Sequence, residues 1–400
     1  MTLVQQQSSQ TKTEVLQRAA ELLDRERSAI LAANKDDLAV CPSEDEVIYD
    51  RLKVDDKKID NMISALNIVD AAPDPTGVVI SEMIRPDGLR VVNKTVPFGT
   101  ILIIYEARPD VSIEAAAIAL KAGNRILLKG GKEARRTNLK LTEIWHEALR
   151  LSGDDTERIR YLDISRQETQ RLIAGETEKF DLVIPRGGEA LIDFTVKNSK
   201  APVMVSGRGN NFLYVDDNAD IDMAAAIAIN GKSRLSVCNA LDKILISGKR
   251  PDLAGDVHRL AAEFRNIGVE VLGDETVTEI DPGIDRVSAD ETWYEEFLAA
   301  KIVIGVVDGL SDAVARVNQY SGGHSASIVT KNEAAAERFM NEVDCAAVYH
   351  NASTRFTDGG EFGLGAEIAI STQKLHARGP LGAKHLTTNK WFVFGNGHTR

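Results

Sequence analysis

The first seventy residues are predicted to be helical, because apolar side chains recur there at the spacing of one helix face. Between residues 12 and 40 this apolar set is Val15, Leu16, Ala19, Leu22 and Leu23. The same spacing predicts further helix over residues 44–70, and Pro73 ends it because proline has no backbone N–H to donate.

The pattern changes between residues 78 and 96. Two apolar runs, 78–84 and 89–96, flank the tetrapeptide Arg85-Pro-Asp-Gly88, which has the composition of a turn. We interpret this segment as a two-stranded arm. A later run, 390–394, is a further strand that could pair with the arm.

From residue 99 onward, apolar strands alternate with helices. Strands are predicted at 100–105, 125–129, 182–185, 203–206, 212–215, 243–247, 269–272 and 301–307. Helices are predicted at 113–122, 132–151, 189–197, 219–229, 251–266, 291–299 and 311–319. This alternation is typical of parallel sheets covered by helices on both faces, and such sheets bind ligands at the carboxyl ends of their strands.

Composition narrows the class of protein. With 400 residues the chain is predicted to form two or three domains, and its net charge of −12 argues against nucleic acid or anionic membrane as a partner. No apolar run reaches the roughly 20 residues that a membrane span needs. The polar residues 1–13 have no signal-peptide pattern, and three widely spaced cysteines give neither a disulfide framework nor a metal site. We therefore expect a cytoplasmic protein.

Cys238 is the candidate nucleophile. It is predicted to lie on a loop between a helix that Asn230-Gly231 ends and the strand 243–247, with the cations Lys232 and Arg234 nearby. A thiol near positive charge forms the reactive thiolate readily. The alternative is a small buried side chain without chemistry.

Two glycine pairs follow predicted strands and precede helices. One is Lys129-Gly-Gly-Lys132 and the other is Arg186-Gly187-Gly188. Backbone N–H groups of such pairs can reach a phosphate, although neither pair matches the dinucleotide fingerprint G-x-G-x-x-G. Tight turns with solvated cations are the alternative.

The order of these features resembles the aldehyde dehydrogenase superfamily and, within it, the gamma-glutamyl phosphate reductase family. The resemblance is carried by Pro97-x-Gly99, Lys129, the second glycine pair, Cys238 and Glu296-Phe297. Further matching segments are Arg51-Leu52, 85–89, 96–99, 105–109, 120–124, 184–188, 236–240, 320–324, 348–360, 361–368 and 370–380.

The resemblance implies reduction of L-glutamyl 5-phosphate by NADPH to glutamate 5-semialdehyde and phosphate, the second step of proline synthesis from glutamate. It implies an aldehyde dehydrogenase-like α/β fold with two doubly wound domains. The cofactor domain would span 1–79 and 97–230, the catalytic domain 231–385, and the oligomerisation arm 80–96 and 386–400. A homo-oligomer, dimer or larger, and a separate glutamate 5-kinase are further implications.

Residue roles follow from the resemblance. Cys238 would be the nucleophile, and Lys129 and Glu296 would hold the cofactor ribose. Gly187 and Gly188 would lie near the cofactor phosphates, with Arg186 supplying charge. The backbone amides of Cys238 and Asn239 are the candidate oxyanion donors. Three residues are assigned either to substrate contact or to a structural role in their loops: His324, Arg355 and Thr357.

Departures from the family pattern also carry information. Hydrolytic aldehyde dehydrogenases have a glutamate that activates water, but the corresponding stretch, 206–210, has none. Its absence favours the reductase over the alternative, a hydrolytic NAD(P)-dependent dehydrogenase; an inactive nucleotide-binding relative is the third candidate. Ala107, Asp110, Asn211-Phe212 and Asp242-Lys243 also differ from the usual pattern.

Overall fold

The computed structural model describes residues 3–41, 46–287 and 289–400, and these form two compact units. Unit 1 comprises 1–206, 363–369 and 381–400, and unit 2 comprises 207–362 and 370–380. The sequence analysis placed the main boundary at residues 230–231. The structure places it at 206–207, because strand β7 (Asn211–Val215) pairs with the strands of unit 2 on both sides.

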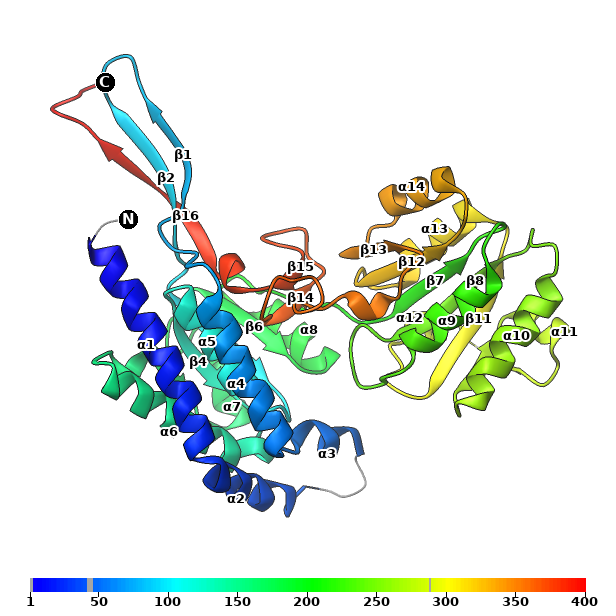
Figure 1. Ribbon diagram of the computed structural model, residues 1–400, viewed down its shortest axis with the longest axis horizontal. Coiled ribbons are helices and arrows are strands. Elements are labelled where there is room, and N and C mark those ends of the chain that lie inside the picture. The colour runs from blue at the N-terminus through cyan, green and yellow to red at the C-terminus, as the bar shows by residue number, and fades with distance from the viewer. Residues whose placement is uncertain (1–2, 42–45, 288) are drawn as a thin grey trace. The chain divides into compact units, whose positions relative to one another are not determined.

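Unit 1 begins with four helices (Figure 1). They are α1 (Leu3–Arg25), α2 (Arg27–Leu38), α3 (Glu46–Leu52) and α4 (Asp56–Ala71). The predicted helix over 44–70 is confirmed over 46–52 and 56–70, although a break at 53–55 divides it into α3 and α4, and its residues 44 and 45 lie outside the described residues. The break occurs because Asp55 caps α4 by accepting a hydrogen bond from the Lys58 backbone N–H at 2.9 Å.

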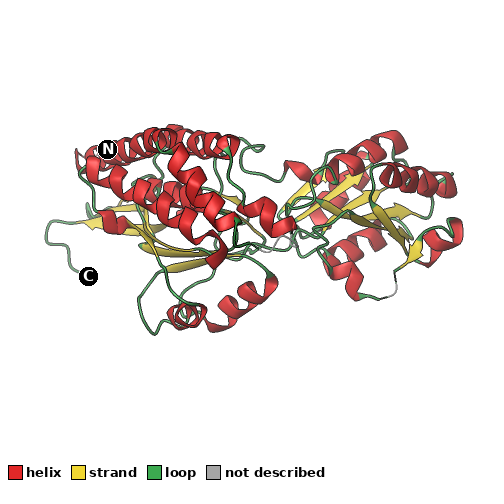
Figure 2. Cartoon of the chain, turned by 90° about the horizontal axis from the view of Figure 1, so that it is seen from below, coloured by secondary structure: helices red, strands yellow, loops and turns green. Residues whose placement is uncertain are grey.

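A four-stranded parallel sheet forms the centre of unit 1, in the order β5-β4-β3-β6. The strands are β3 (Thr100–Tyr105), β4 (Arg125–Lys129), β5 (Ile159–Tyr161) and β6 (Leu182–Arg186). The helices are α5 (Val111–Lys121), α6 (Arg135–Leu151), α7 (Arg166–Ile173) and α8 (Glu189–Asn198). Figure 2 shows helices on both faces of the sheet, as the apolar strands predict. The predicted strand 203–206 is wrong, since Val203 makes only an isolated bridge to Val183.

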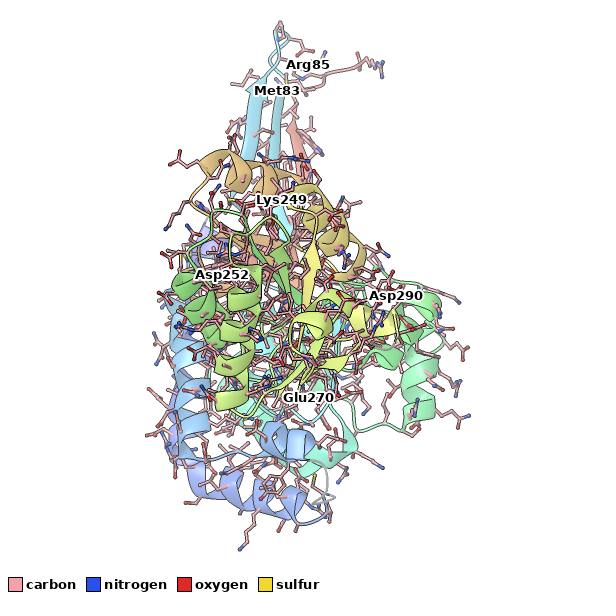
Figure 3. All side chains as sticks on the ribbon, turned by 90° about the vertical axis from the view of Figure 1, so that its right-hand side faces the viewer. Met83, Arg85, Lys249, Asp252, Glu270 and Asp290 are labelled. Atoms are coloured by element: carbon pink, nitrogen blue, oxygen red, sulfur yellow. The ribbon has the colours of Figure 1, made fainter. Side chains whose placement is uncertain are left out.

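A three-stranded antiparallel sheet extends from unit 1 (Figure 1). It consists of β1 (Val79–Ile84), β2 (Arg90–Pro97) and β16 (Thr387–Phe394), in that order. The predicted pairing of the closing strand with the arm is confirmed, because β16 pairs with the whole of β2. All of β1 is exposed, and Figure 3 shows Met83 and Arg85 near the tip of this sheet.

Unit 2 contains a seven-stranded parallel sheet, in the order β10-β9-β11-β8-β7-β12-β13. Besides β7, its strands are β8 (Leu241–Ser247), β9 (Glu270–Gly273), β10 (Asp285–Arg286), β11 (Lys301–Val307), β12 (Ser325–Val329) and β13 (Ala347–His350). Its helices are α9 (Ile221–Gly231), α10 (Leu253–Asn266), α11 (Glu275–Ile280), α12 (Glu291–Tyr294), α13 (Leu310–Tyr320) and α14 (Glu333–Glu342).

The predicted helix 291–299 is wrong beyond residue 294. Its C-terminal half, with Glu296, is a loop in which Leu298 has a left-handed φ of 48°. After residue 320 the closing strand was predicted, but β12, α14 and β13 were not. Short strands β14 (Ala369–Ser371) and β15 (Gly379–Leu381) pair with each other, and short 3₁₀ turns occur at 132–134, 156–158, 354–356 and 383–386. Within the described ranges, every helix is too short or too polar to cross a membrane.

Candidate active site

Cys238 lies on the loop that joins α9 to β8, which confirms its predicted position between a helix and a strand. Its side chain is half-buried. The backbone of Gly209 passes directly against it, because a Cβ atom at residue 209 would overlap the carbonyl group and Cα of Cys238. The stretch that lacks the water-activating glutamate therefore approaches the nucleophile with a bare backbone.

Asn211 fixes the backbone around the cysteine. Its side-chain amide lies within hydrogen-bond distance of three carbonyl oxygens, those of Gly209 at 2.9 Å, Cys238 at 2.8 Å and Ala240 at 2.6 Å. The side chain is fully buried, so these contacts are not weakened by competition with water. The sequence analysis named Asn211 only as a departure from the family pattern, and its role emerges from the fold.

Asn239 joins the nucleophile loop to the segment 354–357. Its Nδ2 donates to the carbonyl oxygens of Arg355 and Thr357, both at 3.1 Å. In return, the Arg355 guanidinium donates to Asn239 Oδ1, and the Thr354 hydroxyl donates to the Asn239 carbonyl oxygen at 2.9 Å. Every polar group of Asn239 except its backbone N–H is thus occupied by this segment.

One positive charge near Cys238 comes from a distant part of the sequence. Lys232, one of the two predicted cations, is buried and bonds Asp242 at 2.6 Å. Arg355 instead interacts electrostatically with Cys238. Burial, and then the neighbouring Arg234, lower the pKa of Arg355. A guanidinium nevertheless stays charged in proteins, so it can stabilise a thiolate at residue 238.

His324 and Thr357 belong to a buried chain of hydrogen bonds. His324 Nδ1 contacts the Ser325 hydroxyl at 2.8 Å, and that hydroxyl contacts Thr357 Oγ1 at 2.7 Å. The Tyr349 hydroxyl lies 2.7 Å from the same Thr357 oxygen. Burial lowers the pKa of His324 to about 4, so the imidazole is neutral at pH 7. No described residue bonds its Nε2. Direct substrate contact by either residue stays a prediction.

Unit 1 brings together four of the five predicted cofactor residues. Lys129 ends β4, and Arg186 ends β6, so both lie at the carboxyl edge of the same parallel sheet. Gly187 and Gly188 follow, and Gly188 is the N-cap of α8. Burial lowers the pKa of Lys129, whose ammonium donates to the Gly130 carbonyl oxygen at 2.6 Å.

A carboxylate occupies the start of α8. Glu106 Oε2 accepts a hydrogen bond from the Gly188 N–H at 3.1 Å, and a Cβ atom at Gly187 would lie only 2.6 Å from the carboxyl carbon. Glu106 lies within the matching segment 105–109, and the sequence analysis gave it no role. Because a helix N-terminus attracts anions, its occupation by a carboxylate fits a site for anionic groups.

The donors at this edge suit a nicotinamide cofactor. An ammonium, a guanidinium and backbone N–H groups are what ribose hydroxyls and a pyrophosphate require. The half-buried Glu114 on α5 interacts with Arg186 and Arg108, which oppose the effect of burial; burial raises the pKa of Glu114 to about 8. The fifth cofactor residue, Glu296, is half-buried on the loop after α12 in unit 2.

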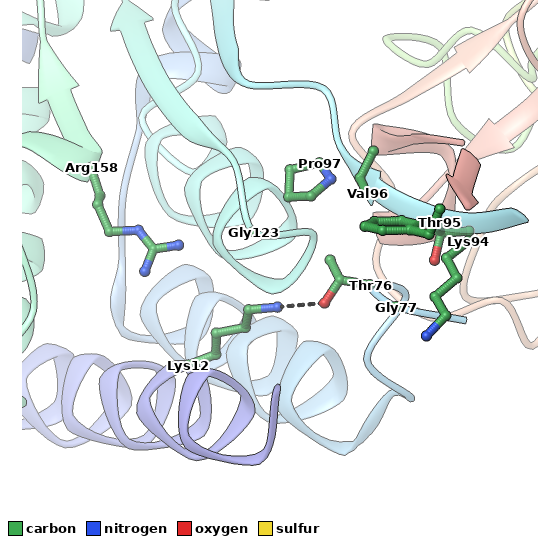
Figure 4. A pocket seen from close by; sticks show the side chains of 10 residues that line it. Lys12, Thr76, Gly77, Lys94, Thr95, Val96, Pro97, Gly123 and Arg158 are labelled. Carbon is green, nitrogen blue, oxygen red and sulfur yellow. Dashed lines mark hydrogen bonds between the residues drawn. The ribbon is translucent and has the colours of Figure 1, made fainter. Parts of the chain in front are cut away.

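A cavity of about 290 Å³ at the base of the three-stranded sheet contains none of the predicted site residues (Figure 4). It is lined by Lys12, Thr76, Lys94 and Arg158, among others. The Lys12 ammonium is already engaged by Asp74 at 3.0 Å. Arg158 likewise bonds Asp154 at 2.7 Å. The positive charges of Lys12 and Arg158 are therefore compensated by carboxylates.

Comparisons with known proteins place this geometry in context. The model of the aldehyde dehydrogenase family matches residues 4–293 and 279–365. Gamma-glutamyl phosphate reductase of Clostridium perfringens strain 13 is 43% identical over 397 residues, covering 98% of this chain and 95% of the relative. The Geobacillus kaustophilus protein of the same name is 40% identical over 396 residues, covering 98% and 94%.

Solved structures give the same picture. The crystal structure of gamma-glutamyl phosphate reductase from Thermotoga maritima matches with a TM-score of 0.92 and 41% identity, covering 98% of this chain and 95% of that one. An acetylating aldehyde dehydrogenase from Geobacillus thermoglucosidasius has a TM-score of 0.70 at 17% identity, over 100% and 93% of the two chains, a likeness of fold alone.

Proposed function

Since the chain belongs to the aldehyde dehydrogenase family, and its relatives of similar length are named gamma-glutamyl phosphate reductase, we propose that it reduces L-glutamyl 5-phosphate to glutamate 5-semialdehyde and phosphate. This reaction is the second step of proline synthesis from glutamate. The single observation that carries the proposal is the nucleophile loop, where Cys238 lies beside the Arg355 cation and the side-chain-free backbone of Gly209.

The chemistry begins at the sulfur. The Cys238 thiolate attacks the carbonyl carbon of the acyl phosphate, the oxygen becomes an oxyanion, and phosphate leaves with the C–O bonding pair. A thioester on Cys238 results. The backbone N–H groups of Cys238 and Asn239 stabilise the oxyanion, and the hydrogen bonds of Asn211 and of segment 354–357 hold those N–H groups in position.

When bound, a reduced nicotinamide cofactor would supply a hydride to the thioester carbon. A second oxyanion then collapses, the C–S bond breaks, and the thiolate is regenerated with the aldehyde product. Arg355 stabilises that leaving thiolate by its charge. Because residues 207–211 contain no carboxylate, no base stands there to activate water against the thioester.

The cofactor is NADPH in this proposal. Lys129 and Glu296 hold the ribose hydroxyls, and Arg186, Gly187 and Gly188 bind the phosphates. The support is the cluster of donors at the carboxyl edge of the unit 1 sheet. Unit 1 is accordingly the cofactor-binding domain and unit 2 the catalytic domain. No metal takes part.

Substrate contacts are assigned to the region around the nucleophile. Arg355 binds the substrate carboxylate or phosphate, since guanidinium groups bind such anions with two parallel hydrogen bonds. Thr357 and His324 support it through the buried chain of hydrogen bonds. The acyl phosphate comes from a separate glutamate 5-kinase, and the enzyme works in the cytoplasm.

The three-stranded sheet is the oligomerisation arm. Its strands β1 and β16 both have an unpaired edge within the described residues, and β1 exposes Val79, Ile80 and Ile84. Apolar side chains on an open sheet are a ready surface for a second copy of the chain. We therefore expect a dimer or larger assembly that disperses when β1 carries charged residues.

The test is the reverse reaction, oxidation of glutamate 5-semialdehyde by NADP with and without phosphate. The reductase requires phosphate, and Cys238→Ser abolishes turnover. Cys345→Ser is the matched control, because burial raises the pKa of Cys345 to about 11 and keeps that thiol unreactive. Turnover without phosphate would instead identify a hydrolytic dehydrogenase. Full activity of Cys238→Ser would overturn the mechanism, and repeating the assay with NAD tests the cofactor.

A further inference from the structure

Lys243 is an unusual residue for its place in the fold. It lies on β8, the central strand of the seven-stranded sheet, and all seven residues of that strand are buried. A lysine in such a place loses its hydration, which costs free energy unless something in the interior compensates. The groups that contact the Lys243 ammonium in the interior therefore indicate the role of this side chain.

The Lys243 ammonium contacts the loop that carries Glu296. Its Nζ donates to the carbonyl oxygen of Glu295 at 2.8 Å. The same Nζ lies 3.7 Å from the centre of the Phe297 ring, close enough for a strong cation–π interaction. Lys243 therefore holds the main chain immediately before Glu296 and the side chain immediately after it.

Asp242 holds the other side of the same residue. Its Oδ2 accepts a hydrogen bond from the Phe297 backbone N–H at 2.9 Å, and its Oδ1 bonds the Lys232 ammonium at 2.6 Å. Both members of that ion pair are buried. Because removing one partner of a buried pair leaves an uncompensated charge, the pair is a rigid anchor for Phe297.

A β-bulge explains how neighbouring side chains reach one loop. Consecutive strand residues normally point to opposite faces of the sheet. Here the register between β7 and β8 shifts, with Leu241 opposite Asn211 and Lys243 opposite Phe212, so Asp242 is the extra residue. Bulges redirect side chains in this way.

The loop needs such support. Leu298 has a φ of 48°, a conformation that costs energy for a residue with a branched side chain and persists only where the surroundings enforce it. Since α12 ends at Tyr294, no helix constrains the backbone at Glu296. Within the described residues, the side chains that hold this loop include Asp242 and Lys243 of β8.

We infer that Asp242 and Lys243 are positioning residues for Glu296, fixing the main chain on both sides of it so that its carboxylate is held ready for the cofactor ribose. This inference rests on the proposed function, in which Glu296 binds that ribose. A carboxylate that accepts from two hydroxyls must be placed to within a fraction of an ångström, which a loose loop does not achieve.

The test measures binding without turnover. The dissociation constant of NADPH is determined by fluorescence titration for the wild type, Glu296→Gln, Lys243→Met and the double variant. We expect about a tenfold weaker affinity for each single variant, the effect of about 1.4 kcal/mol. If Lys243 acts through Glu296, the double variant binds no more weakly than Glu296→Gln alone.

Lys301→Met is the matched control. Its ammonium lies 5.8 Å from the centre of the same Phe297 ring but pairs with Glu270 at 3.4 Å, so NADPH affinity should stay at the wild-type value. Lys243→Met should fold, because methionine fills the buried site without a charge. Thermal unfolding checks this. Asp242→Asn weakens the hold on the Phe297 N–H and gives a second measurement, with the same folding check because it also removes the negative charge that pairs with the buried Lys232.

The outcomes distinguish the assignment of Glu296 to the cofactor from the positioning role of Asp242 and Lys243. Unchanged affinity in Glu296→Gln overturns the assignment of Glu296 to the cofactor, and with it the basis of the inference. Weakened affinity in Glu296→Gln, together with wild-type affinity in folded Lys243→Met and Asp242→Asn, overturns the positioning role alone. Fully additive losses in the double variant also overturn it, because they would mean that Lys243 acts independently of Glu296.

Discussion

Asn239 and Arg355 bind each other in both directions: the Asn239 amide donates to the Arg355 carbonyl oxygen at 3.1 Å, and the Arg355 guanidinium donates to Asn239 Oδ1. More than a hundred positions separate them in the sequence. This reciprocal contact places a permanent cation beside Cys238 and at the same time fixes the backbone of the residue that follows it.

Replacing Arg355 by methionine should slow the reaction of Cys238 with iodoacetamide at pH 7 by about 10-fold, because the thiolate loses a nearby positive charge. The alkylation rate is followed by mass spectrometry of the peptide that contains Cys238. Arg338→Met is the control, since Arg338 is paired with Glu342 on the exposed face of α14. Equal rates in the wild type and Arg355→Met would contradict the electrostatic role of Arg355.

Gly209→Ala should inactivate the enzyme. The added Cβ would overlap the backbone of Cys238, so either the nucleophile loop or the 207–211 segment must move. We expect a loss of about 100-fold in kcat, the effect of a displacement of about 1 Å, in a protein that still folds. In Gly283→Ala the Cβ would meet only the ends of the Asp281 and Arg265 side chains, so activity should persist. An active Gly209→Ala variant would show that the close approach has no role in catalysis.

The burial of His324 leads us to expect that the stability of the protein depends on pH. Its pKa in the folded state is about 4, below the ordinary value of 6.5. The unfolded chain therefore binds more protons between pH 6.5 and 4, and stability falls as the pH drops through this window. Between pH 6.5 and 4, the free energy of unfolding of His324→Gln should fall less than that of the wild type. The difference should reach about 3 kcal/mol at pH 4.

Urea unfolding at several pH values measures this difference. His258→Gln, at an exposed position on α10, is the control and should follow the wild-type pH profile. Parallel pH profiles for the wild type and His324→Gln would mean that His324 is not held neutral in the folded protein.

Glu106 stands where the proposed cofactor phosphates would sit. Removing its negative charge with Glu106→Gln should tighten NADPH binding by about 3-fold, because the carboxylate repels the pyrophosphate near the α8 N-terminus. Fluorescence titration at two ionic strengths tests this, and the gain should shrink at high salt. Glu147→Gln, on the exposed surface of α6, is the control. Weaker binding in Glu106→Gln would show that Glu106 organises the site rather than competing for it.

Sequence patterns located the fold's central elements well. Strands β3 and β11 are largely apolar runs between turn residues, and their burial follows from that pattern. In β8 the apolar run covers only 244–246, and the burial of Asp242 and Lys243 does not follow from the pattern. The predicted helix over 291–299 failed at its second half. Periodicity does not register the tertiary contacts of Asp242 and Lys243, which hold Glu296 in a loop.

In the candidate site, too, the sequence revealed some residues and not others. The loop of Cys238, which follows a helix stop and precedes a strand, made the cysteine a candidate, and the resemblance to the family assigned it as the nucleophile. Its partners were not identifiable by spacing. The Asn211 side-chain amide reaches the Cys238 carbonyl oxygen from a distant segment, and Arg355 contacts the neighbouring Asn239. Lys232, one of the two cations near Cys238 in the sequence, points inward and pairs with the buried Asp242, which spacing alone does not reveal.

The pairing of β2 with β16 has a consequence for how the chain is made. During translation, β1 and β2 leave the ribosome early, whereas their partner β16 follows only after all of unit 2 has been synthesised. Throughout that interval the nascent hairpin has an open edge on β2 beside the exposed apolar face of β1. We expect newly made chains to be most prone to aggregate during this period, and chaperones that shield strand edges to raise the yield of folded protein.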